Sequence, residues 1–230
     1  MKTMFLDTLE GLSRIFRGDI KPPKVILVTG PPGSLKSSFV YMLFSKYLKN
    51  RDEVGLYCTL EESVASHLTN MESLGVELIY NMQIIDFSSL RREEEEMDYL
   101  EFLKKSLVRF KEKYGEHFTL FALDSLGALY SIMEDDTNLR RRMYHFFQFL
   151  RELNLFSFLI MERDPDSPSQ FLGNESYLSD GIIYLGMKNR KGQIIRFIQI
   201  EKMRTVEHSM APHAITVRKG DISILGEILD

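Results

Sequence analysis

The residues with the clearest chemistry form a loop that follows the apolar run at residues 25–28 and precedes a helix-like stretch. The loop has a Gly, four further positions, then Leu, Lys and Ser, close to the template of Gly, four free positions, Gly, Lys and Ser or Thr. In that template, backbone N–H groups and a helix N-terminus wrap phosphates. We therefore predict a phosphate-binding loop made of Gly30, Pro31, Pro32, Gly33, Ser34, Leu35, Lys36, Ser37 and Ser38.

Three side chains suit the phosphates and a magnesium ion. Lys36 would reach the β- and γ-phosphates as a mobile cation, and the Ser37 hydroxyl would ligate Mg²⁺, which prefers hard oxygen ligands. Asp124 ends an apolar run, as does the acid that supports Mg²⁺ at the tip of a buried strand. The alternative is a Gly/Pro turn that precedes a helix and binds no phosphate.

Leu35 stands where the template has its second Gly. If this position needs a positive φ angle, a branched Leu is strained there and phosphate binding suffers. If the position already lies in the first helical turn, Leu is tolerable. We expect the second arrangement, because Lys36 and Ser37 must be helical for the phosphate cradle to form.

Glu61 and Glu62 follow the strand that we predict at residues 54–59. Ligands of open α/β sheets bind outside the carboxyl ends of the strands, so at least one of these carboxylates is expected to face the same crevice as the phosphate loop. The alternative is a pair of acids at a helix N-terminus, where the macrodipole favours negative charge. For Glu62 this alternative weighs at least equally.

Apolar runs alternate with stretches that repeat apolar residues every three or four positions. They predict strands at residues 25–28, 54–59, 82–86, 118–124 and 155–161, and helices at residues 38–49, 63–74, 97–114 and 138–153. Further strands follow at residues 182–187, 194–203, 214–217 and 222–225. A solvated loop or helix start is expected at residues 91–96, and a loop at residues 164–173. This order predicts a single α/β domain at residues 21–230, with a mainly parallel central sheet flanked by helices and antiparallel C-terminal strands.

The first 20 residues are expected to form an amphipathic helix and a linker. Residues 4–16 place Phe5, Leu9, Leu12 and Phe16 at helical spacing, with charged residues elsewhere on the wheel. We expect this helix to pack on the core of its own domain. A helix that binds a partner or a membrane surface is the alternative.

The composition argues against several classes of protein. The 29 basic and 33 acidic residues give a net charge of −4, which offers no global attraction to nucleic acid or to an anionic membrane. No apolar stretch approaches the ~18 residues that a membrane-spanning helix needs. Cys58 is the only cysteine and permits no internal disulfide, so we expect a cytoplasmic protein.

Several separate segments resemble the KaiC-like ATPases of the RecA superfamily. The similarity runs in order over residues 24–225, and its most specific part is Lys202-Met203-Arg204, with His208 and Pro212-His213 after it. The other matching segments are residues 30–37, 56–63, 123–126 and 176–183. The resemblance implies a RecA-like P-loop NTPase fold, with ATP and Mg²⁺ as cofactors.

The resemblance also implies roles for individual residues. Lys36 contacts the phosphates, Ser37 and Asp124 hold Mg²⁺, and Glu61 is the general base on the attacking water, with Glu62 as the second acid of the pair. In this family, Lys202 and Arg204 reach the γ-phosphate bound to a neighbouring subunit. The implied working form is therefore a homo-oligomeric ring, with a hexamer favoured, and the implied activity is slow ATP hydrolysis.

Two departures from the family limit these expectations. Thr205 replaces the Gly that commonly follows Lys-Met-Arg in the family. Ser176-Tyr177 stands where the circadian clock member of the family has its autophosphorylated Ser-Thr pair, so kinase activity is not supported. The alternative function is a nucleotide-responsive interaction module with little or no hydrolysis, which Leu35 favours and which would have a protein partner. A DNA recombinase is disfavoured by the acidic balance of charge.

Overall fold

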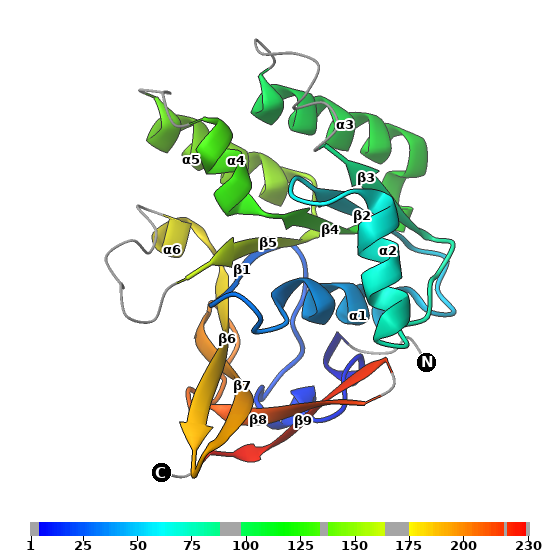
Figure 1. Ribbon diagram of the computed structural model, residues 1–230. Coiled ribbons are helices and arrows are strands. Elements are labelled where there is room, and N and C mark those ends of the chain that lie inside the picture. Colours follow the sequence, from blue (N-terminus) through cyan, green and yellow to red (C-terminus); the bar gives the residue numbers. More distant parts are fainter. Residues whose placement is uncertain (1–4, 88–97, 134–137, 164–174, 219, 229–230) are drawn as a thin grey trace.

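The computed structural model of the 230-residue chain describes residues 5–87, 98–133, 138–163, 175–218 and 220–228. Its described strands form one sheet in the order β3-β2-β4-β5-β1-β6-β7-β8-β9 (Figure 1). These strands are β1 (Lys24–Gly30), β2 (Val54–Thr59), β3 (Met82–Asp86), β4 (Phe118–Asp124), β5 (Phe156–Glu162), β6 (Gly181–Arg190), β7 (Gln193–Met203), β8 (His213–Arg218) and β9 (Asp221–Glu227). The loop or helix start predicted at residues 91–96 and the loop predicted at residues 164–173 lie outside the described residues.

The sheet confirms the predicted fold class. The pairs β3–β2, β2–β4, β4–β5, β5–β1 and β1–β6 are parallel, whereas β6–β7, β7–β8 and β8–β9 are antiparallel. Strand β1 lies in the middle, and all of its residues are buried. A strand that is buried on both faces needs an unbroken apolar run, and this is the pattern that the sequence shows at residues 25–28.

Helices cover both faces of the parallel part of the sheet (Figure 1). The helices are α1 (Lys36–Leu48), α2 (Val64–Ser73), α3 (Tyr99–Tyr114), α4 (Leu126–Ile132), α5 (Leu139–Glu152) and α6 (Glu175–Leu178). Ile26 and Val28 pack in the cluster that contains α1, while Val25 and Leu27 pack in the cluster that contains α3 and α5. Alternate residues of β1 therefore bind the two layers together.

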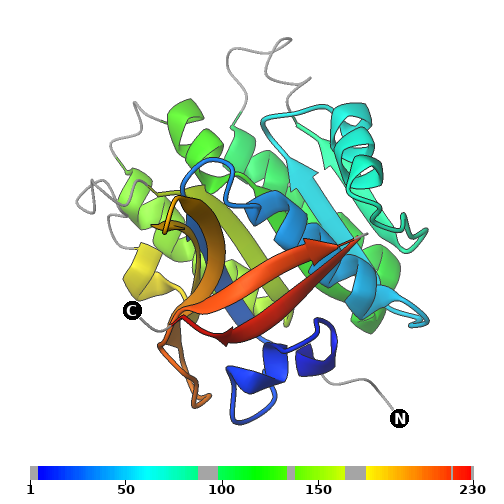
Figure 2. The same ribbon diagram turned by 60° about the horizontal axis from the view of Figure 1, so that its bottom comes forward.

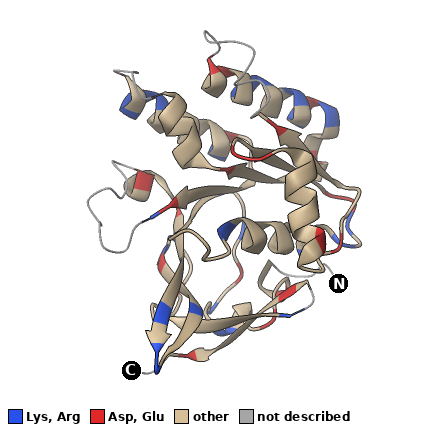
Figure 3. Cartoon of the chain, in the orientation of Figure 1, with Lys and Arg blue, Asp and Glu red and all other residues tan. Residues whose placement is uncertain are grey.

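The helices bury apolar residues and expose polar ones, as α3 shows. Helix α3 buries Leu100, Leu103, Leu107 and Phe110, and it carries charged residues of both signs along its length (Figure 3). Among the described helices, none has the length and the apolar character that a membrane crossing requires.

The expected amphipathic helix at residues 4–16 is wrong. The chain instead forms two short 3₁₀ helices, η1 (Phe5–Asp7) and η2 (Leu12–Arg14), beside β9 (Figure 2). The backbone N–H of Ile224 donates to the carbonyl of Glu10 over 2.8 Å, and that of Ser209 donates to the carbonyl of Ile15 over 2.8 Å. The backbone of this segment thus bonds to distant strands and turns, which local periodicity does not reveal.

The apolar side chains of this segment nevertheless face the core. Phe5, Leu9, Leu12 and Phe16 are at most 5% exposed. The ring of Phe5 lies 4.8 Å from that of Phe156 on β5. The residues that were predicted to form the apolar stripe of a helix are therefore buried, but the backbone that carries them is not an α-helix.

Gly11 allows this close approach, and its replacement tests it. Its φ angle is 83°, and a Cβ atom there would collide with the carbonyl oxygen of Ile224. We expect Gly11→Ala to lower the free energy of unfolding by about 2 kcal/mol or more, because a strained φ and a backbone collision add. Gly18→Ala is the matched control, since nothing lies within 4 Å of its added Cβ. Urea unfolding of both variants measures the difference, and equal losses would contradict the packing described.

Candidate nucleotide-binding site

The predicted phosphate loop joins the carboxyl end of β1 to the N-terminus of α1 (Figure 1). Gly30 has a φ angle of 150°, and a Cβ there would collide with the carbonyl oxygen of Leu185 on β6. Gly33 has a φ angle of 76° and open space around it. Glycine is therefore required at Gly30 by packing and favoured at Gly33 by backbone conformation.

The expectation for Leu35 is wrong. Leu35 is the N-cap of α1, with φ 76° and ψ 27°, and so lies in the left-handed region rather than in the first helical turn. Its carbonyl already accepts the first helical hydrogen bond, from the N–H of Phe39 over 2.8 Å. Glycine adopts this positive φ without strain, which accounts for the Gly at this position of the template.

A cavity of about 280 Å³ lies against the loop. It brings together the four side chains that are predicted to contact phosphate, Mg²⁺ or the attacking water, namely Lys36 and Ser37 from α1, Glu61 from the end of β2 and Asp124 from the end of β4. The full lining is Pro32, Gly33, Leu35, Lys36, Ser37, Ser38, Glu61, Asp124, Ser125, Ile160 and Glu162. Of the remaining predicted residues, Gly30, Pro31 and Ser34 shape the loop without lining this cavity, and Glu62, Lys202 and Arg204 lie outside it.

Lys36 is held inside the loop. Its Nζ donates to the carbonyl of Pro31 over 3.0 Å and lies 3.9 Å from a carboxylate oxygen of Glu162. Burial lowers the pKa of Lys36 from its ordinary value, while the charges of Glu162, Asp124 and Glu61 oppose this shift. An anion in the cavity would favour the charged form in the same way.

A buried tyrosine contacts one of the two predicted magnesium ligands. The hydroxyl of Tyr57 donates to Oδ2 of Asp124 over 2.6 Å. Burial raises the pKa of Tyr57 well above its ordinary value, and the negative charge of Asp124 adds to the effect. The tyrosine therefore keeps its proton and acts as a donor to the carboxylate.

The oxygen atoms of Ser37 and Asp124 suit Mg²⁺, which is commonly held by one or two protein ligands together with phosphate oxygens and waters. The described residues contain no group of three or more His, Cys, Asp or Glu that could hold a metal ion. The donor set therefore fits a magnesium ion that arrives with a nucleotide, and not one held by the protein alone.

Glu61 and Glu62 have different surroundings. Glu61 lines the cavity and accepts a hydrogen bond from the Ser125 hydroxyl. Glu62 instead contacts α2, where its carboxylate lies 2.8 Å from Nδ1 of His67 and accepts from Ser66 Oγ and Asn70 Nδ2, each over 3.0 Å. The structure thus places Glu61 toward the crevice and Glu62 on the start of a helix.

Lys202 and Arg204 lie at the other end of β1 from the loop. The Nζ of Lys24, the first residue of β1, donates to the carbonyl of Arg204 over 3.2 Å. The phosphate loop, by contrast, follows the last residue of the same strand. At ~3.3 Å per residue, the strand separates these two places by roughly 20 Å. Neither cation can reach the phosphate loop of its own chain.

Both cations contact the short helix α6 and the residues after it. Lys202 Nζ donates to the carbonyls of Ser176 and Ser179, each over 2.7 Å. Arg204 donates to the carbonyl of Tyr177 over 2.8 Å and lies 3.5 Å from Asp180. Burial lowers the pKa of Lys202, and the neighbouring Arg204 and Arg151 lower it further.

Sequence reasoning missed three polar residues of the site. Tyr57 lies inside a predicted strand, where an aromatic residue indicates a core position and not a site residue. Ser125 follows Asp124 and is also the N-cap of α4, accepting from the N–H of Ala128 over 3.1 Å. Glu162 ends β5, and the strand-end argument that identified Asp124 could have found it.

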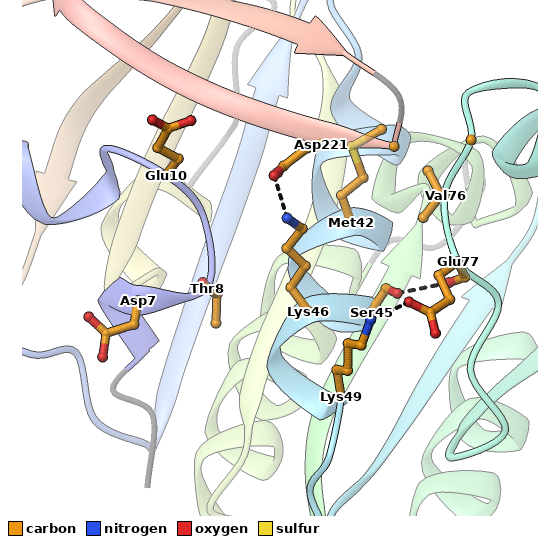
Figure 4. Close-up of a pocket in the computed structure, with 12 residues that line it drawn as sticks. Asp7, Thr8, Glu10, Met42, Ser45, Lys46, Lys49, Val76, Glu77 and Asp221 are labelled. Carbon is orange, nitrogen blue, oxygen red and sulfur yellow. Dashed lines mark hydrogen bonds and ion pairs between the residues drawn. The ribbon is translucent and has the colours of Figure 1, made fainter. Parts of the chain in front are cut away.

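A larger hollow of about 530 Å³ lies away from the loop, between the N-terminal turns, the second half of α1 and the start of β9 (Figure 4). Its cations are paired within the chain. Lys46 lies 2.5 Å from Asp221, and Lys49 lies 2.5 Å from Glu77. The larger hollow does not contain the N-terminus of α1. The smaller cavity has this N-terminus and Lys36 beside it, and both suit phosphate.

Comparisons with known proteins agree with this geometry. The family model described as "ATPase: KaiC" matches residues 7–228. The chain is 25% identical over 225 residues to the circadian clock oscillator protein KaiC of Picosynechococcus, and 26% identical over 228 residues to the circadian clock protein KaiC2 of Synechocystis. Each alignment covers 94% of this chain but only 43% and 39% of those relatives, so the chain spans less than half of their length.

A solved structure shares the fold. The KaiC-like protein of Pyrococcus horikoshii OT3 superposes with a TM-score of 0.81 at 19% identity, covering 98% of this chain and 99% of that one. At this identity, the likeness is one of fold.

The left-handed Leu35 gives a test of the loop. Leu35→Gly and Leu35→Ala remove the same branched side chain, but only Gly relieves the left-handed strain, which costs about 1–2 kcal/mol. We expect the Gly variant to exceed the Ala variant in free energy of unfolding by about 1 kcal/mol. Thermal and urea unfolding measure the two values. Equal stabilities would show that position 35 is not held in the left-handed region.

Proposed function

The chain belongs to the KaiC family of ATPases, and from this premise we propose that it binds ATP with Mg²⁺ and hydrolyses it slowly in a ring of identical subunits. The observation that carries the proposal is the cavity that unites Lys36, Ser37, Glu61 and Asp124. These four side chains come from three segments that are distant in sequence. Each has a chemistry that phosphoryl transfer to water requires.

Binding is assigned to the loop and to α1. The backbone N–H groups at the N-terminus of α1 and the ammonium of Lys36 would face the phosphates. Lys36 would then exchange its contacts with Pro31 and Glu162 for phosphate oxygens. Ser37 and Asp124 would hold Mg²⁺, with Asp124 acting through water, and the ion would neutralise charge on the phosphates.

Hydrolysis is assigned to Glu61. A general base has to lie within hydrogen-bond reach of the attacking water, and its orientation has to be fixed. Glu61 lines the cavity, and the hydroxyl of Ser125 holds its carboxylate. Ser125 is itself fixed as the N-cap of α4, so the orientation of Glu61 is linked to the end of β4.

Assembly into a ring, with a hexamer favoured, is supported by the position of Lys202 and Arg204. Their separation from the loop of their own chain excludes a role in that site. Three cations, Lys202, Arg204 and Arg151, surround the single carboxylate of Asp180, and the side chain of Arg204 is 49% exposed. An excess of positive charge at an exposed end suits the γ-phosphate of a neighbouring subunit, as an arginine finger does.

A second function is favoured by one observation. The left-handed Leu35 stores strain in the loop that has to hold the phosphates. A loop that binds nucleotide at this cost can serve a regulatory module that responds to nucleotide with little hydrolysis and presents a surface to a protein partner. Turnover in the wild-type chain separates the two functions. For either one we propose the cytoplasm, where the buried free thiol of Cys58 would stay reduced.

We expect Glu61→Gln to keep the affinity for Mg-ATP and to lower turnover by roughly 10²-fold or more, because binding does not need a base and hydrolysis does. Glu62→Gln is the matched control and should lower turnover less, since Glu62 contacts α2. Lys36→Ala should instead weaken nucleotide binding by about 2 kcal/mol or more. Calorimetry measures binding, and phosphate release measures turnover.

Three results would contradict this assignment. Equal turnover in Glu61→Gln and wild type would place the base elsewhere. Unchanged affinity in Lys36→Ala would remove the loop from the binding site. Absence of phosphate release in the wild type would leave the regulatory module as the function.

Assembly has its own test. Mixed rings of Arg204→Ala and Glu61→Gln subunits should regain activity, because some interfaces then join an intact Glu61 to an intact Arg204 from the neighbour. Rings of either variant alone are the controls, and mass measurement with and without Mg-ATP confirms assembly. Mixed rings that show no recovery at any ratio would contradict action across the interface.

A further inference from the structure

Tyr57 directs its hydroxyl at Asp124, one of the two residues that are assigned to Mg²⁺. The side chain is fully buried in β2 and donates to Oδ2 of Asp124 over 2.6 Å. Asp124 ends β4, which pairs with β2, so this hydrogen bond joins two neighbouring strands.

The position of this hydroxyl is fixed by packing. The ring of Tyr57 lies 4.6 Å from that of His67 on α2, 6.0 Å from that of Tyr41 and 6.4 Å from that of Phe44, both on α1. A ring that is enclosed by two helices cannot adopt another rotamer without moving them. The phenol oxygen therefore has a fixed position beside Asp124.

The direction of this hydrogen bond decides which oxygen of Asp124 remains for a metal. Asp124 is a carboxylate and can only accept, so the Tyr57 proton points to its Oδ2. Oδ1 of Asp124 accepts no hydrogen bond from the described residues and stays available.

We propose that Tyr57 is a positioning residue that orients the Asp124 carboxylate of the magnesium site through its hydroxyl. This inference rests on the proposed function, because it needs a nucleotide that brings Mg²⁺ to the cavity. Groups that hold metal ligands from behind commonly change metal affinity by 10–100-fold when they are removed.

The test compares Tyr57→Phe with Tyr41→Phe. Each variant loses one hydroxyl from the same cluster of buried rings, and Tyr41 makes no hydrogen bond to Ser37 or Asp124 among the described contacts. Calorimetry gives the affinity for ADP in Mg²⁺ and in EDTA, and the paramagnetic resonance of Mn²⁺ gives metal binding in the presence of ADP. We expect Tyr57→Phe to weaken Mn²⁺ binding by about tenfold or more, with unchanged ADP affinity in EDTA. Tyr41→Phe should match the wild type in both.

Two outcomes of these measurements would overturn the inference. One is wild-type Mn²⁺ affinity in Tyr57→Phe, and the other is an equal loss of Mn²⁺ affinity in Tyr41→Phe. A Tyr57→Phe chain that fails to fold while Tyr41→Phe folds would also overturn it, by assigning the hydroxyl to the stability of the fold. A wild-type chain that binds no ADP would refute the proposed function itself.

Discussion

The structure depends on the register of the buried parallel strands. Thr59 of β2 pairs with Asp124 of β4, Asp124 pairs with Ile160 of β5, and Gly30 of β1 pairs with Glu162. These strands therefore end nearly level, and the acids just beyond or at their ends meet at one edge of the sheet. A shift of one residue in any of these strands would turn a ligand from one face to the other. The apolar residues that fix the register thus fix the site.

In the phosphate loop, the packing of the neighbouring elements overrides the backbone preference of one residue. Leucine disfavours the left-handed region, yet Leu35 adopts it directly before a helix that is buried along most of its length. Moving α1 to relieve Leu35 would disturb Phe39, Met42 and Leu43, which are all at most 1% exposed. Strain of about 1–2 kcal/mol at one residue costs less than a cavity in the core.

Elements with one dominant signal could be predicted from the sequence. The strands β2, β3 and β4 have the predicted bounds, and Lys36, Ser37, Glu61 and Asp124 share one cavity because strand ends of a parallel sheet converge. The N-terminal segment could not be predicted, since its backbone bonds to β9 and to Ser209, about 200 residues away. Tyr57 could not be predicted as a site residue either, because only the packing of α1 and α2 around its ring shows where its hydroxyl lies.

The same central strand separates two sets of charges. Its carboxyl end carries Lys36 among the carboxylates of Glu61, Asp124 and Glu162, and the residues beside its start include Lys202, Arg204 and Arg151 around Asp180. A rigid buried strand keeps its two ends apart. The cations beside its start therefore cannot contact the phosphate loop of the same chain. In the proposed ring, the acidic edge of one subunit that holds the phosphate loop and the cationic edge of the next would form a single site. Turnover would then depend on the contact between subunits.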